Sequence, residues 1–219
     1  MQTLFTVIFD PDFLKTVWYS AARILGGFFT ALTLGTVLGW VASRFWVVET
    51  LLRPITAVIK ATPVASFIIL VLLWFSGKNL SVIISMLMVF PVIYMNVLEG
   101  IRSADEKLLE MAQVFRLSVG KKLLYIYLPA VAPFFVSACS VSLGLCWKSG
   151  IAAEVIGTPD GSIGAVFYQA KIFLQTSELL AWTVVVVAVS VAFEKLFMFL
   201  LRLVLKKLKM EDVLNGKRA

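Results

Sequence analysis

The chain has 219 residues, of which 60% are hydrophobic and 15% charged, and its mean hydropathy is +0.95. Soluble domains are nearer half apolar and a quarter charged, so this composition excludes an ordinary soluble protein and indicates a chain dissolved mainly in lipid. The formal net charge of +7 does not indicate nucleic-acid binding, because no basic stripe alternates with aromatic side chains that could stack on bases. With no histidine, and with Cys139 and Cys146 together in one apolar segment, the sequence offers no disulfide framework or metal site.

Five apolar segments predict an all-α membrane protein with a single transmembrane domain over residues 1–219 and a core at 17–205. The first, at about 17–42, carries Gly35 and Gly39, a spacing that lets two helices approach closely. The second, at about 61–76, is short for a crossing and begins near Pro63, which suits the first turn of a helix. The remaining three lie at about 80–98, 130–147 and 179–205.

Two long polar connections are expected, at 99–129 and 148–178, and basic residues are divided unequally between alternate connections. Cytoplasmic loops carry the excess of Lys and Arg, so five spans place the 99–129 loop and the C-terminus in the cytoplasm and the N-terminus outside. The cytoplasmic set is Arg44, Arg53, Lys60, Arg102, Lys107, Arg116, Lys121, Lys122, Arg202, Lys206, Lys207, Lys209, Lys217 and Arg218, and the opposite set is Lys15, Lys78, Lys148 and Lys171.

The 99–129 loop contains a short helical pattern. Its apolar residues Leu108, Met111, Ala112 and Phe115 fall at positions i, i+3, i+4 and i+7, which predicts a stripe on an otherwise polar helix. Such a stripe needs a surface to cover it. Two alternatives are open: the helix packs on its own spans or lies in the membrane interface, or it docks in a groove on a soluble partner.

The same loop resembles a known motif. Glu110, Met111 and Ala112, followed by Ile126, Leu128 and Pro129, resemble the EAA loop of binding-protein-dependent ABC importer permeases in both residue types and spacing. Arg116 stands where that family has glycine, so we expect either a remodelled turn or a compensating role for Gly120. The segments 53–75, 99–102 and 153–176 are similar to the nitrate, sulfonate and taurine branch of these permeases.

The resemblance implies a type I ABC permease in the inner membrane, working by alternating access that a coupling helix at Leu108–Phe115 drives. It implies a second permease copy or paralogue, two ATPase subunits that bind ATP and Mg, and an extracytoplasmic solute-binding protein. The chain itself would hold no cofactor and would not be an enzyme. A phosphate-binding Gly-x-x-x-x-Gly-Lys-Ser/Thr loop is indeed absent from the sequence. The solute would be a small organic anion, sulfonate-like or nitrate-like, or a vitamin precursor.

Polar and aromatic residues within the spans are candidates for lining the solute pathway, since charged and polar groups avoid lipid. For the hydroxyl and amide groups among them, a hydrogen bond to the residue's own helix is the alternative role. Lys148 and Glu154, expected in the outer connection, could attract an anion, pair with each other or cap helices. Glu194 and Lys195 in the last span are expected to be structural. The pathway candidates are Thr62, Ser66, Ser85, Asn96, Ser140, Ser142, Trp147, Lys148 and Glu154.

Two other functional classes compete with the importer hypothesis. A channel or secondary transporter would move solute without any ATPase. An integral membrane enzyme would need a cluster of His, Cys or acidic groups near one interface, and no such cluster is evident in the sequence.

Overall fold

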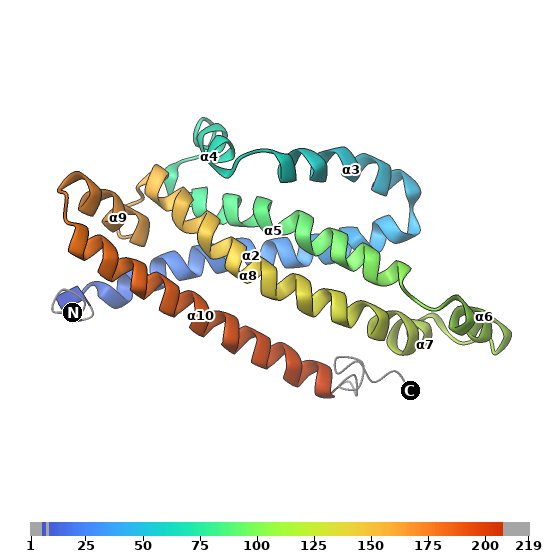
Figure 1. Ribbon diagram of the computed structural model, residues 1–219. Coiled ribbons are helices and arrows are strands. Elements are labelled where there is room, and N and C mark those ends of the chain that lie inside the picture. The colour runs from blue at the N-terminus through green and yellow to red at the C-terminus, as the bar shows by residue number, and fades with distance from the viewer. Residues whose placement is uncertain (1–5, 8, 208–219) are drawn as a thin grey trace.

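The computed structural model describes residues 6, 7 and 9–207, and the elements assigned in this part of the chain are all helical (Figure 1). In chain order they are α2 (Phe13–Arg44), α3 (Trp46–Ala61), α4 (Val64–Leu72), α5 (Gly77–Arg102), α6 (Glu106–Val114), α7 (Val119–Lys122), the π-helical turn η1 (Leu123–Tyr127), α8 (Leu128–Gly157), α9 (Ile163–Ile172) and α10 (Thr176–Lys207). The basic residues Lys209, Lys217 and Arg218, used above to orient the C-terminus, lie outside the described residues.

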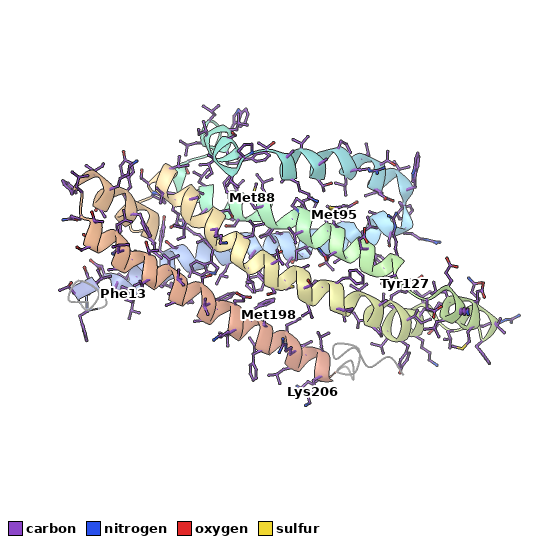
Figure 2. All side chains as sticks on the ribbon, in the orientation of Figure 1. Phe13, Met88, Met95, Tyr127, Met198 and Lys206 are labelled. Atoms are coloured by element: carbon purple, nitrogen blue, oxygen red, sulfur yellow. The ribbon has the colours of Figure 1, made fainter. Side chains whose placement is uncertain are left out.

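Helices α2, α5 and α8 pack side by side and form the centre of the molecule (Figure 1). Phe28, Ile93 and Leu143, one from each helix, are almost fully buried in the largest apolar cluster. Helix α10 lies along the outside of this group, and only 6% of its most apolar segment is buried. Figure 2 labels Phe13 and Lys206 at opposite ends of the bundle, which we name the α9 end and the α6 end after the short helices found there.

Small residues allow α2 and α5 to cross closely, which confirms the expectation drawn from Gly35 and Gly39. A Cβ on Gly35 would lie 2.9 Å from the Ile93 Cβ, and one on Gly39 would lie 3.0 Å from the Tyr94 carbonyl oxygen. Gly27, about two helical turns before Gly35, makes the tightest of these approaches. The two helices therefore meet backbone to backbone between Gly27 and Gly39 of α2.

Within the described residues, four helical segments are long and apolar enough to cross a bilayer: 13–44, 77–102, 119–157 and 176–207. A fifth crossing in this part of the chain requires that α3 and α4 be counted together, and these are bent by 105° relative to each other. The second apolar segment, expected at 61–76 and short for a crossing, is shorter still, because α4 has nine residues, and a fifth span needs α3 as well. Thr62 is extended, as the residue before a proline prefers to be, so the helix breaks directly before Pro63.

Helix α8 is longer than expected, and the predicted connection at 148–178 is mostly helical. Lys148 and Glu154 both lie within α8, so their assignment to the outer connection is wrong. The chain then turns at Thr158, which has a left-handed φ of 40°, and forms α9 before α10 begins. Glycine and small residues in the sequence suggested a loop here, whereas the structure continues α8 through Lys148, which is exposed, and Glu154, which is buried.

Candidate functional site

The short helix expected in the 99–129 loop is present as α6, which lies beyond the α6 end of the bundle (Figure 1). Asp105 caps it, because the Asp105 side chain accepts a hydrogen bond from the Lys107 N–H at 2.8 Å. The helix ends at Val114, with Phe115 as its C-cap. The Leu117 N–H bonds the Ala112 carbonyl at 2.9 Å, and the Arg116 N–H bonds the Gln113 carbonyl at 3.0 Å. This pair of bonds is a Schellman motif.

Arg116 has a φ of 49°, so the residue in the family's glycine position adopts the left-handed conformation itself. Gly120 does not take over this position, because it lies in the short helix α7 and has no positive φ. The expected compensation by Gly120 is therefore wrong, and the arginine bears a backbone cost of about 1 kcal/mol that glycine would avoid.

The apolar stripe of α6 is covered on one side only. Ala112 is fully buried against Ala104 and Ile126, but Leu108 is 43% exposed and Met111 is 46% exposed. Phe115, which completes the stripe, is 71% exposed. Glu110 is exposed as well. The chain thus anchors α6 through Ala112 and the partly buried Leu109, and leaves Leu108, Met111 and Phe115 largely exposed.

The second half of the motif lies where the loop enters α8. Ile126 is buried in the π-helical turn η1, and Leu128 packs beside Ala132 and Leu205. Pro129 follows in the first turn of α8 and has no N–H to bond the carbonyl of Tyr125. The π-helical turn η1 lies directly before Leu128 and Pro129, and a π-helical turn is wider than an α-helical one. Helix α7, η1 and α8 follow one another without a break and form one helical segment from residue 119 to 157.

Two of the pathway candidates are bonded to their own helices. The Thr62 hydroxyl donates to the Val58 carbonyl at 2.8 Å, and the Asn96 amide donates to the Val92 carbonyl at 2.8 Å. Ser66 is exposed on α4. None of these three residues lines a cavity with another pathway candidate among the described pockets.

Other candidates join helices of the bundle. The Ser85 hydroxyl on α5 donates to the Cys146 carbonyl on α8 at 3.2 Å. The Ser140 hydroxyl on α8 donates to Glu194 Oε1 on α10 at 2.9 Å, so Glu194 faces a neighbouring helix. Trp147 and Ser142 are buried in α8, and neither the indole N–H nor the hydroxyl has a partner among the described residues.

Glu154 is fully buried, and its partners come from distant parts of the chain. Its Oε2 accepts a hydrogen bond from the Ser20 hydroxyl at 2.6 Å and from the Gly164 N–H at 3.4 Å. The Ser20 oxygen in turn accepts the Ile163 N–H at 2.9 Å. The two side chains thereby cap the first turn of α9, which was one of the roles considered for Glu154. No sequence signal pointed to Ser20.

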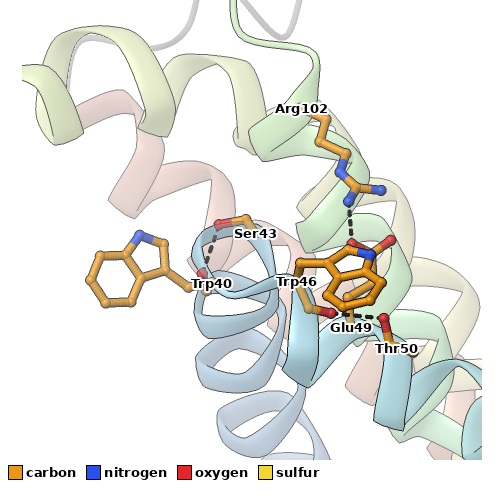
Figure 3. Close-up of polar contacts among 6 residues, drawn as sticks. All are labelled: Trp40, Ser43, Trp46, Glu49, Thr50 and Arg102. Carbon is orange, nitrogen blue, oxygen red and sulfur yellow. Dashed lines mark hydrogen bonds and ion pairs between the residues drawn. The ribbon is translucent and has the colours of Figure 1, made fainter.

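A polar cavity of about 230 Å³ lies between α3 and α5, and sequence reasoning missed it. Glu49, Arg53 and Thr56 present one face of α3 to it, while Tyr94 and the residues up to Arg102 present one face of α5. Arg102 and Glu49 form an ion pair across the two helices (Figure 3). Near the same groove the Lys60 ammonium approaches the sulfur of Met95, labelled in Figure 2, at 3.5 Å.

A detectable signal for this cavity exists in the sequence. Glu49, Arg53, Thr56 and Lys60 fall at i, i+4, i+7 and i+11, the spacing of one face of an amphipathic helix. Charged residues in a membrane protein turn away from lipid toward the protein or water, as these do. Exposed Trp40 and Trp46 flank the turn from α2 to α3 (Figure 3), and tryptophan is enriched at membrane interfaces.

Long apolar helices, charges turned inward and a short, partly covered helix beyond one end of the bundle are the features of a multi-pass membrane protein. Residues 31–210 match the family described as the binding-protein-dependent transport system inner membrane component, and the chain belongs to that family. It is a multi-pass protein of the cytoplasmic membrane, as predicted.

Relatives place the chain in the predicted branch. It is 30% identical over 173 residues to the putative aliphatic sulfonates transport permease of Bacillus subtilis, covering 78% of this chain and 62% of the relative. It is 26% identical over 200 residues to the taurine transport system permease of Escherichia coli, covering 89% of this chain and 72% of the relative. The nitrate import permease of Synechococcus elongatus is 25% identical over 185 residues, or 74% of this chain and 66% of the relative.

The fold also matches a solved structure. A chain of an amino acid ABC transporter crystallised with histidines superposes with a TM-score of 0.61 at 16% sequence identity, covering 89% of this chain and 96% of that chain. The similarity shows a shared fold, which agrees with the predicted ABC permease architecture.

Proposed function

We propose that this chain is the permease subunit of an ATP-driven importer, in which α6 is the coupling helix for a separate ATPase subunit. One observation carries the proposal: the family's spaced residues Glu110, Ala112 and Ile126 gather at a helix whose larger apolar side chains are uncovered. A groove on a soluble partner would cover Leu108, Met111 and Phe115. The alternative in which α6 packs on its own spans accounts for Ala112 alone.

The packing at this end suggests how motion passes inward. Ala112 of α6 packs against Ile126, which lies in the turn that leads directly into α8. On its other side, α6 is joined to the end of α5 by three residues. A displacement of α6 would therefore move α5 and α8 together, as a rigid-body change between inward-open and outward-open states requires. In this scheme two ATPase subunits bind ATP and Mg, and a second permease copy or paralogue completes the membrane portion.

The solute is proposed to be a small anion, because the relatives are named for sulfonates, taurine, nitrate and bicarbonate. The polar cavity between α3 and α5 is the best candidate for a pathway wall, because charged and polar side chains line it; Arg53 and Arg102 are matched there by Glu49 and Glu99. Of the original pathway candidates, exposed Lys148 and Ser66 remain available to solute. An extracytoplasmic binding protein would deliver the solute to the opposite side.

Reconstitution tests this function. The chain is placed in proteoliposomes with the ATPase subunit and binding protein of the same transport system, and uptake of radiolabelled taurine is measured with and without ATP. We expect Met111→Glu to abolish ATP-dependent uptake, because it puts a charge on the uncovered face of α6. Gln113→Glu, on the polar face of the same helix, is the matched control and should retain uptake.

The contrary outcomes are distinct. Uptake of equal rate without the ATPase would establish a channel or secondary transporter instead. Full ATP-dependent uptake by Met111→Glu, at wild-type amounts in the membrane, would remove α6 from the coupling role. Nitrate, bicarbonate and methanesulfonate, each with its binding protein, replace taurine in parallel reactions to identify the solute.

A further inference from the structure

The Schellman turn that ends α6 fixes where Arg116 points. Residue 116 occupies the left-handed position after the C-cap, a position that glycine occupies at the least cost. The bonds from the N–H groups of Arg116 and Leu117 hold that conformation, and Leu117 packs beside Ala112. The arginine side chain therefore leaves the end of the helix in a direction set by the backbone.

Nothing within the described chain engages this side chain. Arg116 is exposed, and no ion pair or hydrogen bond from its guanidinium is present among the described residues. The segment 113–122 also carries Lys121 and Lys122 and contains no acidic residue. Exposed Phe115 and Val119 lie on either side of Arg116 along the chain. The tip of the loop thus offers positive charge next to apolar side chains.

The position of the tip favours a protein over lipid as its partner. The continuous helical segment 119–157 has 39 residues and is about 58 Å long at 1.5 Å per residue. A bilayer core is about 30 Å thick, so this segment extends well beyond it. Helix α6 lies farther out still along the same direction (Figure 1). Arg116, at the end of α6, is therefore within reach of a soluble subunit at this end of the molecule.

We propose that Arg116 is a recognition residue for the ATPase subunit, whose acidic side chain at the rim of the α6 groove forms an ion pair with the guanidinium. The inference rests on the proposed coupling function and adds to it a contact that glycine at this position could not make. Arginine suits the role because its planar fork binds a carboxylate through two hydrogen bonds.

A titration of purified permease with the purified ATPase subunit of the same system tests this contact. The permease is held in nanodiscs of neutral phosphatidylcholine, so anionic headgroups are absent. We expect Arg116→Gly to weaken binding about ten-fold, the loss typical of one charge-assisted hydrogen-bonded pair. Arg116→Lys keeps the charge but loses the two-bond fork, so its affinity should fall between those of wild type and Arg116→Gly. Added salt screens the ion pair, so it should narrow the difference in ATPase affinity between wild type and Arg116→Gly.

Leu174 provides a matched control. It ends α9 in the same Schellman geometry, with a φ of 53° and a bond from the Gln175 N–H to the Ala170 carbonyl at 2.8 Å, but lies at the opposite end of the bundle. Leu174→Gly relieves equivalent strain and should leave ATPase affinity unchanged. This separates loss of the guanidinium from relief of the turn.

Three outcomes would overturn the proposal. Arg116→Gly binding as tightly as wild type would show that the arginine is only tolerated in the turn. A difference that emerges only after anionic phosphatidylglycerol is added would assign the side chain to lipid headgroups. If the wild-type permease does not bind the ATPase subunit, both the proposed coupling function and the proposed Arg116 contact are wrong. If wild type and Arg116→Gly both bind tightly, the Arg116 contact alone is wrong.

Discussion

Gly27 is the position where α2 and α5 approach most closely, and a single methyl group tests that approach. A Cβ on Gly27 would lie 2.4 Å from the Val82 carbonyl oxygen and 2.8 Å from the Ser85 Cβ. Carbon and oxygen in contact normally stay about 3.3 Å apart, so Gly27→Ala forces the two helices apart by roughly 1 Å. Overpacking of this kind costs about 1–3 kcal/mol.

The neighbouring Gly26 provides the control, because a Cβ there meets nothing within 4 Å. Both substitutions gain up to about 1 kcal/mol of helix propensity, so the difference in stability between them isolates the steric cost. We expect Gly26→Ala to be neutral or stabilising and Gly27→Ala to unfold earlier in a denaturant titration in detergent micelles. Equal stability of the two variants would refute the close crossing of α2 and α5.

Two further predictions concern polar contacts. Glu154→Leu leaves the Ser20 hydroxyl and the Gly164 N–H unpaired in a buried site. We therefore expect the free energy of unfolding to fall by about 2–4 kcal/mol in the same unfolding titration. Glu154→Gln keeps an acceptor oxygen, so its free energy of unfolding should fall by about half as much. Identical losses for both variants would contradict this account. In the ion pair between Glu49 and Arg102, the arginine side chain is 54% exposed. A double-mutant cycle should therefore give a coupling energy below about 1 kcal/mol. A coupling energy of several kcal/mol would contradict the exposed character of the pair.

The long apolar helices could be predicted because their signal is local. Length and hydropathy identify α2, α5 and α10 from the sequence alone. The second span could not be assigned correctly, since its first half is the amphipathic helix α3, in which Glu49, Arg53 and Lys60 suggest a polar connection. Only the neighbouring face of α5 makes that polar side an interior one.

The candidate site around α6 was likewise predictable from the sequence in part. The stripe Leu108, Met111, Ala112 and Phe115 predicted a helix whose observed bounds differ by about two residues at the start. Burial within the stripe could not be predicted, because it depends on Ala104 and Ile126 on either side of the loop. Glu154 is the extreme case: its partner Ser20 is 134 residues away in the chain, and only the assembled bundle brings the two together.

The peripheral position of α10 has a consequence for the order in which the molecule assembles during synthesis. Helices α2, α5 and α8 bury one another, and all three precede Thr176 in the chain, whereas α10 contributes little buried surface of its own. The ribosome therefore releases a nearly complete core into the bilayer before the last helix emerges. Helix α10 then docks on that core through Trp182 and Val185, which are buried beside Ile163, and through the hydrogen bond from Ser140 to Glu194.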